Sequence, residues 1–404
     1  MTRLLVRDLA QVATPPAAHP PLRGRALRDV AVVDDAYVLC RDGVIEAVGP
    51  MRELDARLLG DVEELDGRGT SAVPGLVDCH THPAWGGDRV EEFSLRAGGA
   101  SYEELHAAGG GILSTVAATR ALGEDGLRAR VERHAAWMLA QGTTTWEGKS
   151  GYGLDRDTEL ASLRAIRTAG GSPTWLGAHA VPPEHPDADA YLDFLLSDVL
   201  VDAAQLADAA DVFLERGAFD AAQARRYLEA CRAKRLALRL HGDQFTESGA
   251  IPLAVELGAR SVDHLEATGA DGTRALAASD VVGVLLPASA LFLDRPMPPA
   301  RALVDAGAAI ALATDFNPGS AFTESLPLVC SLACTQLHLS PEEALTAVTV
   351  NAAHVLGLAH DRGRIAPGLR ADLLLVGAED WRHLAYHLAG DVVAHVVQAG
   401  AVQL

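Results

Sequence analysis

The feature that most constrains the fold is an alternation in the middle of the chain. Eight short apolar runs recur there, and each is followed by a stretch rich in Ala, Leu, Arg and Glu. Such runs are typical of strands buried on both faces of a parallel sheet, and the stretches between them favour helices. Eight units over about 280 residues predict a closed (β/α)8 barrel of the TIM type, with a doubly wound open sheet as the alternative. The runs are SAVPGLVDCHTH, TTTWEGKS, PTWLGAHAV, ADVFLERGA, LALRLHGDQ, RSVDHLE, VVGVLLP and AIALATDFNPG.

The two ends of the chain differ from this middle part. Both contain short alternating or β-branched segments separated by Pro, Asp and Gly, which is typical of strands joined by turns. We therefore expect an α/β protein with a small β-sandwich domain built from both termini. Residues 1–70 form the first part of the sandwich, residues 71–358 form a metal-dependent barrel, and residues 359–404 form the second part.

Titratable side chains lie at or just past the ends of seven of the eight runs. In a (β/α)8 barrel the carboxyl ends of the strands surround the active site, so this pattern predicts an active site at that end. The residues are His80 and His82, Lys149, His179, Glu215, His241, His264 and Asp315.

Some of these side chains have the character of metal ligands. His80 and His82 are two apart, which places both imidazoles on one face of a strand. Because a barrel closes, His241 and Asp315 face the same cavity, and together the four give a mixed nitrogen and oxygen site with room for a water. We expect His264 to hold that water. Lys149 is either a modified ligand that bridges a second metal or a partner of a substrate or a carboxylate. A single-metal site needs no bridging ligand, so it favours the pairing role.

Net charge and cysteine content limit the partners. The formal charge is −20, from 34 basic and 54 acidic residues, which disfavours nucleic acid and anionic membranes and leaves a small-molecule substrate. A single Arg can still hold an anionic substrate locally, and Arg89, in a Gly-rich stretch after the first run, is a candidate carboxylate clamp. The five Cys are scattered, with no CxxC pair, and we find neither a signal peptide nor a bilayer-spanning run. We expect a cytoplasmic protein.

Several sequence blocks carry a resemblance to a known family. PGLVDCHTH, HGDQ, DHLE and GRIAPGLRADLLLV resemble the amidohydrolase superfamily. HTHPAWGGDR, EEFSLRAGGASYEELHAAGGGILSTVAATR, EGKSGYGLD, LGAHAVP and ATDFNPGS are similar to the imidazolonepropionase family of histidine degradation. This similarity covers nearly the whole chain. One small departure is Pro83, where an aliphatic residue is expected.

The resemblance implies a function and a set of site residues. The reaction would be hydrolysis of the cyclic amide 4-imidazolone-5-propanoate to N-formimino-L-glutamate, with one Zn or Fe ion and a homodimeric enzyme. The metal ligands would be His80, His82, His241 and Asp315, and the catalytic residues would be Asp315, His264 and Gln244. Contacts with the substrate would come from Arg89, Tyr152, His179, Gln244, Asn317, Gly319 and Ser320.

Two other functions compete with this one. The chain could be another ring-opening amidohydrolase or an aminohydrolase that acts on a small heterocycle. Superfamily deaminases carry a proton-shuttling Glu where this chain has Gln244, and an amide cannot shuttle a proton, which disfavours deamination. A metal-dependent binding protein on an inactive barrel should have lost a ligand, and all four candidate ligands are present here.

Overall fold

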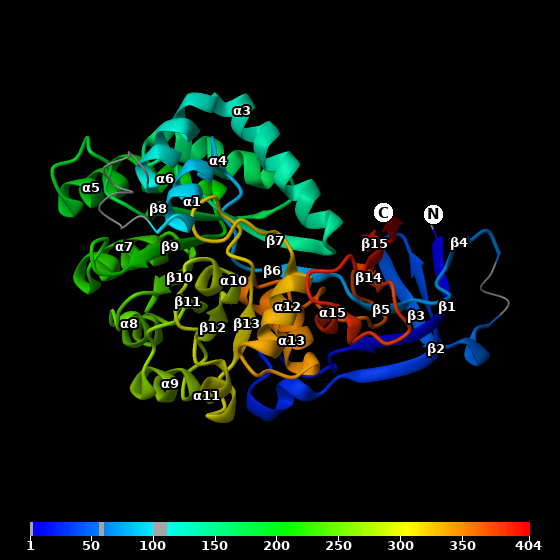
Figure 1. Cartoon of the computed structure of the whole chain (residues 1–404). Coiled ribbons are helices and arrows are strands. Elements are labelled where there is room, and N and C mark those ends of the chain that lie inside the picture. Colours follow the sequence, from blue (N-terminus) through cyan, green and yellow to red (C-terminus); the bar gives the residue numbers. More distant parts are fainter. Residues whose placement is uncertain (1–2, 56–59, 100–110) are drawn as a thin grey trace.

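The computed structural model of the chain describes residues 3–55, 60–99 and 111–404, and its main body is a barrel of eight parallel strands (Figure 1). Each barrel strand pairs with the next one along the chain, and each of the eight predicted runs contains one barrel strand, so the predicted barrel is confirmed. The strands are β6 (Leu76–Asp78), β7 (Thr143–Lys149), β8 (Ser172–Ala178), β9 (Ala209–Leu214), β10 (Ala237–Gly242), β11 (Ser261–His264), β12 (Val282–Leu285) and β13 (Ile310–Leu312).

The barrel closes just beyond the ends of its first and last strands. Thr81 forms a parallel bridge with Phe316. The backbone N–H of Asp315 donates to the carbonyl of His80 at 3.1 Å, and the N–H of His82 donates to the carbonyl of Phe316 at 2.9 Å. This closure brings the predicted His and Asp ligands from the two ends of the barrel sequence next to each other.

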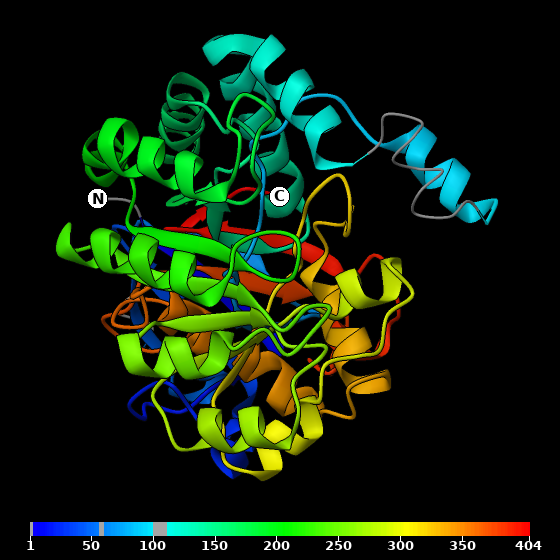
Figure 2. The ribbon, with the colours of Figure 1, turned by 90° about the vertical axis from the view of Figure 1, so that its left-hand side faces the viewer.

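Helices cover the outside of the barrel, and α1 stands out from its rim (Figures 1 and 2). Side-chain caps start several of them: Asp155 accepts a hydrogen bond from the N–H of Thr158 in α4, and Asp220 and Ser340 form capping boxes in α7 and α13. The described α-helices are α1 (Val90–Ala97), α3 (Ile112–Ala140), α4 (Arg156–Thr168), α5 (Ala188–Phe194), α6 (Leu200–Leu206), α7 (Ala221–Ala233), α8 (Ala250–Leu257), α9 (Ala270–Ala277), α10 (Pro287–Phe292), α11 (Ala300–Asp305), α12 (Leu326–Thr335), α13 (Pro341–Ala347), α14 (Val350–Val355) and α15 (His383–Tyr386).

Both termini contribute to a second sheet beside the barrel, as predicted (Figure 1). Its hydrogen bonds join all eight strands into one curled sheet, in the order β16-β15-β14-β5-β1-β2-β3, with β4 paired to β1. Apolar side chains pack on both faces of this sheet. Successive residues of a strand point to opposite faces, and Leu4 and Leu5 of β1 accordingly belong to different apolar clusters. The strands are β1 (Arg3–Thr14), β2 (Ala31–Arg41), β3 (Val44–Pro50), β4 (Glu63–Asp66), β5 (Ser71–Pro74), β14 (Leu373–Val376), β15 (Val393–Gln398) and β16 (Ala401–Val402).

A large apolar core lies between the barrel strands and their helices and includes Trp175, Leu240 and Ile310, all fully buried. In the described ranges, none of the helices combines the length and the apolar character needed to cross a bilayer. The division of the chain at residues 70 and 358 stays a prediction. Part of the Gly-rich stretch that follows the first run, residues 100–110, lies outside the described residues.

Candidate metal and active site

The predicted metal ligands converge at the carboxyl end of the barrel. His80 and His82 follow β6, His241 lies in β10, and Asp315 follows β13; all four are buried. Nε2 of His82 lies 3.3 Å from Nε2 of His80 and 3.4 Å from Nε2 of His241. Oδ1 of Asp315 lies 3.5 Å from Nε2 of His80 and 3.4 Å from Nε2 of His82.

These separations fit a metal ion. Zn–N bonds of about 2.0–2.1 Å in a tetrahedral site place neighbouring ligand atoms about 3.3–3.4 Å apart. Three imidazole nitrogens at such distances cannot all be protonated, and lone pairs that face one another need a cation between them. His264 lies at the side of this set, where one of its nitrogens, His80 and His241 offer atoms within 4.8 Å of one another.

Two buried carboxylates fix the tautomers of the imidazoles. Nδ1 of His80 donates to Oδ2 of Asp263 at 2.6 Å, and Nδ1 of His241 lies 3.0 Å from Oδ2 of Asp211. A carboxylate only accepts, so the proton of His80 is held on Nδ1 and the lone pair of its Nε2 is left for the centre of the site. The carboxylate of Asp211 favours the same tautomer of His241, although the two make a close contact and not an aligned hydrogen bond. This arrangement of carboxylate, histidine and metal is typical of ligating histidines.

Lys149 lies behind these carboxylates, inside the barrel, and is fully buried. Its Nζ is 2.8 Å from Oε1 of Glu147, 2.8 Å from Oδ2 of Asp211 and 3.8 Å from Oδ2 of Asp263. Of the two roles considered for Lys149, the structure therefore favours pairing with carboxylates over bridging a second metal. Arg239 adds a second cation to this layer, since its Nη1 lies 2.6 Å from Oε1 of Glu147.

A small cavity of about 70 Å³ opens above the ligands. Nδ1 of His179 donates to the carbonyl of Gly151 at 2.9 Å, so Nε2 of this ring is left as an acceptor; burial lowers the pKa of His179 to about 3 and keeps it neutral. Among the described residues, the side-chain amide of Gln244 and the hydroxyl of Tyr152 have no hydrogen-bond partner, and both face the cavity. The lining residues are His82, Tyr152, His179, Phe213, His241, Gln244, His264, Asp315, Asn317 and Ser320.

Arg89 lies at the start of α1, beside the loop that follows Asp315. Its Nε and Nη2 donate to the carboxylate of Glu92, with Nε at 2.9 Å. Its Nη1 lies next to Gly319, where a Cβ atom would come within 2.3 Å of it. Arg89 does not line the small cavity. It lines a separate pocket of about 260 Å³ together with Phe93, Phe292 and Pro318, so its predicted contact with substrate stays a prediction.

Comparisons with known proteins agree with this geometry. The model of the amidohydrolase family matches residues 71–402. The imidazolonepropionase of Rubrobacter xylanophilus is 59% identical over 99% of this chain and 98% of its own length, and that of Deinococcus radiodurans is 45% identical over 99% and 100%. The chain is a member of the imidazolonepropionase family.

The solved structures that resemble this family member share its fold at low identity. An adenosine deaminase from Xanthomonas campestris with bound zinc aligns over 100% of this chain and 93% of its own, with a TM-score of 0.69 and 20% identity. The guanine deaminase of E. coli covers 100% of this chain and 99% of its own, with a TM-score of 0.71 and 15% identity.

The loop after β13 holds Asp315 in place. Nδ2 of Asn317 donates to Oγ of Ser320 at 2.7 Å, and Oγ of Ser320 donates to Oδ2 of Asp315 at 3.2 Å. Oδ1 of Asn317 accepts from the N–H groups of Gly319 and Ser320, both at 2.8 Å. The side-chain amide of Asn317 is therefore hydrogen-bonded within the loop. Contact of Asn317, Gly319 and Ser320 with substrate stays a prediction.

His264 ends β11 with a strained backbone. Its φ is 87°, and that of Leu265 is 72°, a region that branched and bulky residues seldom adopt. The strain turns the ring so that Nδ1 faces Oε1 of Glu266 at 3.4 Å. Burial lowers the pKa of His264, but the carboxylates of Glu266 and Asp315 more than offset it, so the net pKa lies above the usual value.

Several supporting residues of the site were missed when only the ends of the apolar runs were considered. Asp211 and Asp263 lie inside the runs ADVFL and SVDH, and a charged residue within an apolar strand could have identified them. Glu215 was singled out, but its carboxylate accepts from the N–H of Phe245 at 2.8 Å and so braces the loop that carries Gln244.

Proposed function

We infer that this chain hydrolyses 4-imidazolone-5-propanoate to N-formimino-L-glutamate in histidine degradation, as an imidazolonepropionase. The observation that carries the inference is a buried His and Asp cluster with metal-ligand spacing, at a cavity lined by Tyr152 and Gln244, in a chain 59% identical to an imidazolonepropionase. We further propose that it acts in the cytoplasm, which fits five cysteines that are all free thiols, and that it is a homodimer.

We propose that one Zn or Fe ion is held by His80, His82, His241 and Asp315. Such an ion acts as a Lewis acid and lowers the pKa of a water in the site toward 7, to about the value at which hydroxide forms at neutral pH. The spacing of the four ligand atoms and the protons held on Nδ1 of His80 and His241 support this ligand set.

Proton movement is assigned to Asp315. Its carboxylate lies at the floor of the cavity and takes the proton of the attacking water as the water oxygen bonds to the ring carbonyl carbon. The C–N bond of the ring then breaks, and Asp315 passes the proton to the departing nitrogen. His264, whose Nδ1 is held by Glu266, presents Nε2 to the cavity and stabilises the oxyanion.

Substrate binding is assigned to four side chains around the cavity. Nε2 of His179 can only accept, so it takes a hydrogen bond from a ring N–H. Tyr152 donates its hydroxyl, and the amide of Gln244 donates or accepts. Nη1 of Arg89, which lies beside Gly319, is assigned to the propionate carboxylate.

The direct test follows the loss of imidazolone propionate absorbance with protein of measured metal content. We expect turnover that scales with one equivalent of Zn or Fe per chain, and none with guanine or a hydantoin. Turnover of those rings without turnover of imidazolone propionate would contradict the inference. The mass of the native protein in solution tests the homodimer.

A further inference from the structure

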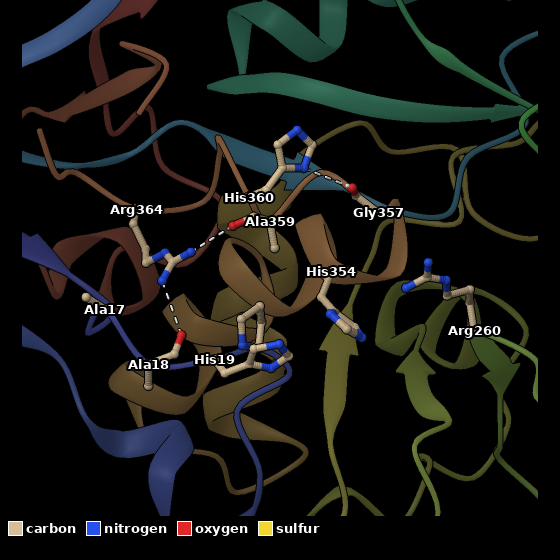
Figure 3. A pocket seen from close by; sticks show the side chains of 10 residues that line it. Ala17, Ala18, His19, Arg260, His354, Gly357, Ala359, His360 and Arg364 are labelled. Carbon is tan, nitrogen blue, oxygen red and sulfur yellow. Dashed lines mark hydrogen bonds between the residues drawn. The ribbon is translucent and has the colours of Figure 1, made fainter. Parts of the chain in front are cut away.

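A second pocket lies at the other end of the barrel from the active site (Figure 3). Its volume is about 600 Å³, within the usual range for sites that bind small molecules. Arg260, which directly precedes β11, lines it, whereas His264 at the far end of the same strand lines the active site. The other walls come from residues 17–20, between β1 and β2, and from residues 354–364, at and after α14.

The lining of this pocket is basic in a strongly acidic protein. It contains two arginines and three histidines and no Asp or Glu, although the chain has 54 acidic and 34 basic residues. The basic residues are His19, Arg260, His354, His360 and Arg364.

Within the described residues, neither arginine has a carboxylate partner. Arg364 donates to two backbone carbonyls, those of Ala359 at 2.7 Å and Ala18 at 3.2 Å. The side chain of Arg260 has no hydrogen bond or ion pair within the described part of the chain. The nearby carboxylate of Asp280 is already paired with Arg23, at 2.8 Å.

The electrostatic potential in the pocket is positive, because its charged side chains are arginines that no described carboxylate neutralises. The pKa of His354 falls to about 4 because its ring is partly buried and because Arg260, His19 and Arg23 lie near it. At neutral pH this ring is therefore uncharged and still offers one N–H donor. Figure 3 shows Arg364 and Arg260 on opposite sides of His19 and His354, so the two guanidinium groups face the pocket from two directions.

We propose that this pocket binds a small organic anion with two separated oxyanion groups, one for each arginine. Guanidinium groups bind carboxylates and phosphates through paired hydrogen bonds, and two such groups on opposite walls match a ligand charged at both ends. The ligand would contact three segments that are distant in sequence. Because it binds only the folded chain, it stabilises that chain by a free energy that rises with the logarithm of its concentration above Kd.

The experiment is calorimetric titration of the metal-loaded protein with two probes, at an ionic strength kept constant with NaCl. The probes are adipate, with two carboxylates, and fructose 1,6-bisphosphate, with two phosphates. We expect saturable binding of at least one, and an increase of about tenfold or more in Kd for Arg260→Gln, since a charge-assisted pair is lost. The control is Arg274→Gln, an exposed arginine of α9 that is paired with Asp271, which should bind as wild type.

The outcomes separate clearly. Binding of adipate alone assigns a dicarboxylate, and binding of the bisphosphate alone assigns a phosphorylated ligand. No saturable heat with either probe overturns the proposal, as does unchanged binding by Arg260→Gln. If Arg260→Gln does not fold, His19→Gln replaces it, because His19 is exposed between the two arginines and its loss should weaken the same binding.

Discussion

His264 is the residue that most sharply tests which side chains are ligands. The four proposed ligand atoms lie 3.3–3.5 Å from their neighbours, and His264 lies outside that set. His80→Ala, His82→Ala, His241→Ala or Asp315→Ala should lower metal affinity by more than about 100-fold, because one ligand is removed. His264→Ala should keep the metal and lose turnover. Elemental analysis of the purified variants decides, and a fully metallated, active His241→Ala would remove the proposed site.

Arg89 is tested by the charge on the substrate. The protein carries a net charge of −20, so the pocket must supply the positive charge that an anionic substrate needs. Loss of a charge-assisted pair costs about 2–5 kcal/mol, so Arg89→Met should lower kcat/KM by about 30-fold or more and leave the metal content unchanged. Arg89→Lys should recover only part, since a lysine lacks the guanidinium fork.

A matched substrate gives the control for Arg89. An analogue without the carboxylate should be a poor substrate of the wild type and nearly insensitive to the substitution. Equal losses with both substrates would mean that Arg89 supports the loop around Glu92 and Gly319, and that the carboxylate is bound elsewhere.

His134 predicts how stability depends on pH. Its ring stacks on Trp85 and donates from Nδ1 to the carbonyl of Pro83, and burial lowers its pKa from 6.5 to about 4. The neutral ring therefore contributes stability that is complete above pH 6.5 and is lost as the pH falls to about 4, up to about 3 kcal/mol. In His134→Phe this part of the pH dependence should be absent, as urea unfolding at pH 7 and pH 4.5 would show. Identical pH dependence in the two proteins would contradict the assignment.

At the scale of elements, the strands were predictable because both of their faces are buried. All seven residues of β7 are buried, and each of the eight apolar runs became a barrel strand. The loops were less predictable, since a loop is shaped by contacts with distant side chains. The block EGKSGYGLD illustrates this, because the carboxylate of Glu159 in α4 accepts from the N–H groups of Gly151 and Gly153, both at 2.9 Å, and of Leu154 at 3.1 Å.

Glu159 therefore determines where Tyr152 lies. Gly151 has a φ of 103°, and a Cβ atom there would lie 2.8 Å from the carbonyl oxygen of Leu176, so this loop has little freedom once Glu159 binds it. Glu159→Gln replaces one acceptor oxygen with a donor and should destabilise the protein by about 1–3 kcal/mol. It should also raise KM more than it lowers kcat. Asp157→Asn, an exposed position in the same helix, is the control. A stable variant with an unchanged KM would show that the loop holds itself.

Across the whole molecule, barrel closure explains which parts of the site the sequence could predict. His80 and Asp315 are far apart in sequence, but a closed barrel makes the ends of its first and last strands neighbours, so their meeting was predictable. The charged layer beneath them was not. Its members lie within four strands, β7, β9, β10 and β11, and their pairing depends on side-chain directions that only the folded barrel defines.

This layer makes Lys149 the residue on which the barrel interior and the metal site both depend. It lies within 4 Å of Glu147, Asp211 and Asp263, and two of these carboxylates, those of Asp211 and Asp263, contact Nδ1 of His241 and of His80. Lys149→Met removes a buried cation and leaves these carboxylates to repel one another, which costs about 3–5 kcal/mol. We expect a lower midpoint in urea unfolding and at least about tenfold weaker metal binding in competition with a chelator, since the partners of the ligands are disturbed.

Lys234→Met changes the other lysine of the chain, which is exposed, and should leave both measurements unchanged. Wild-type metal affinity in a folded Lys149→Met protein would show that Asp211 and Asp263 orient their histidines without it.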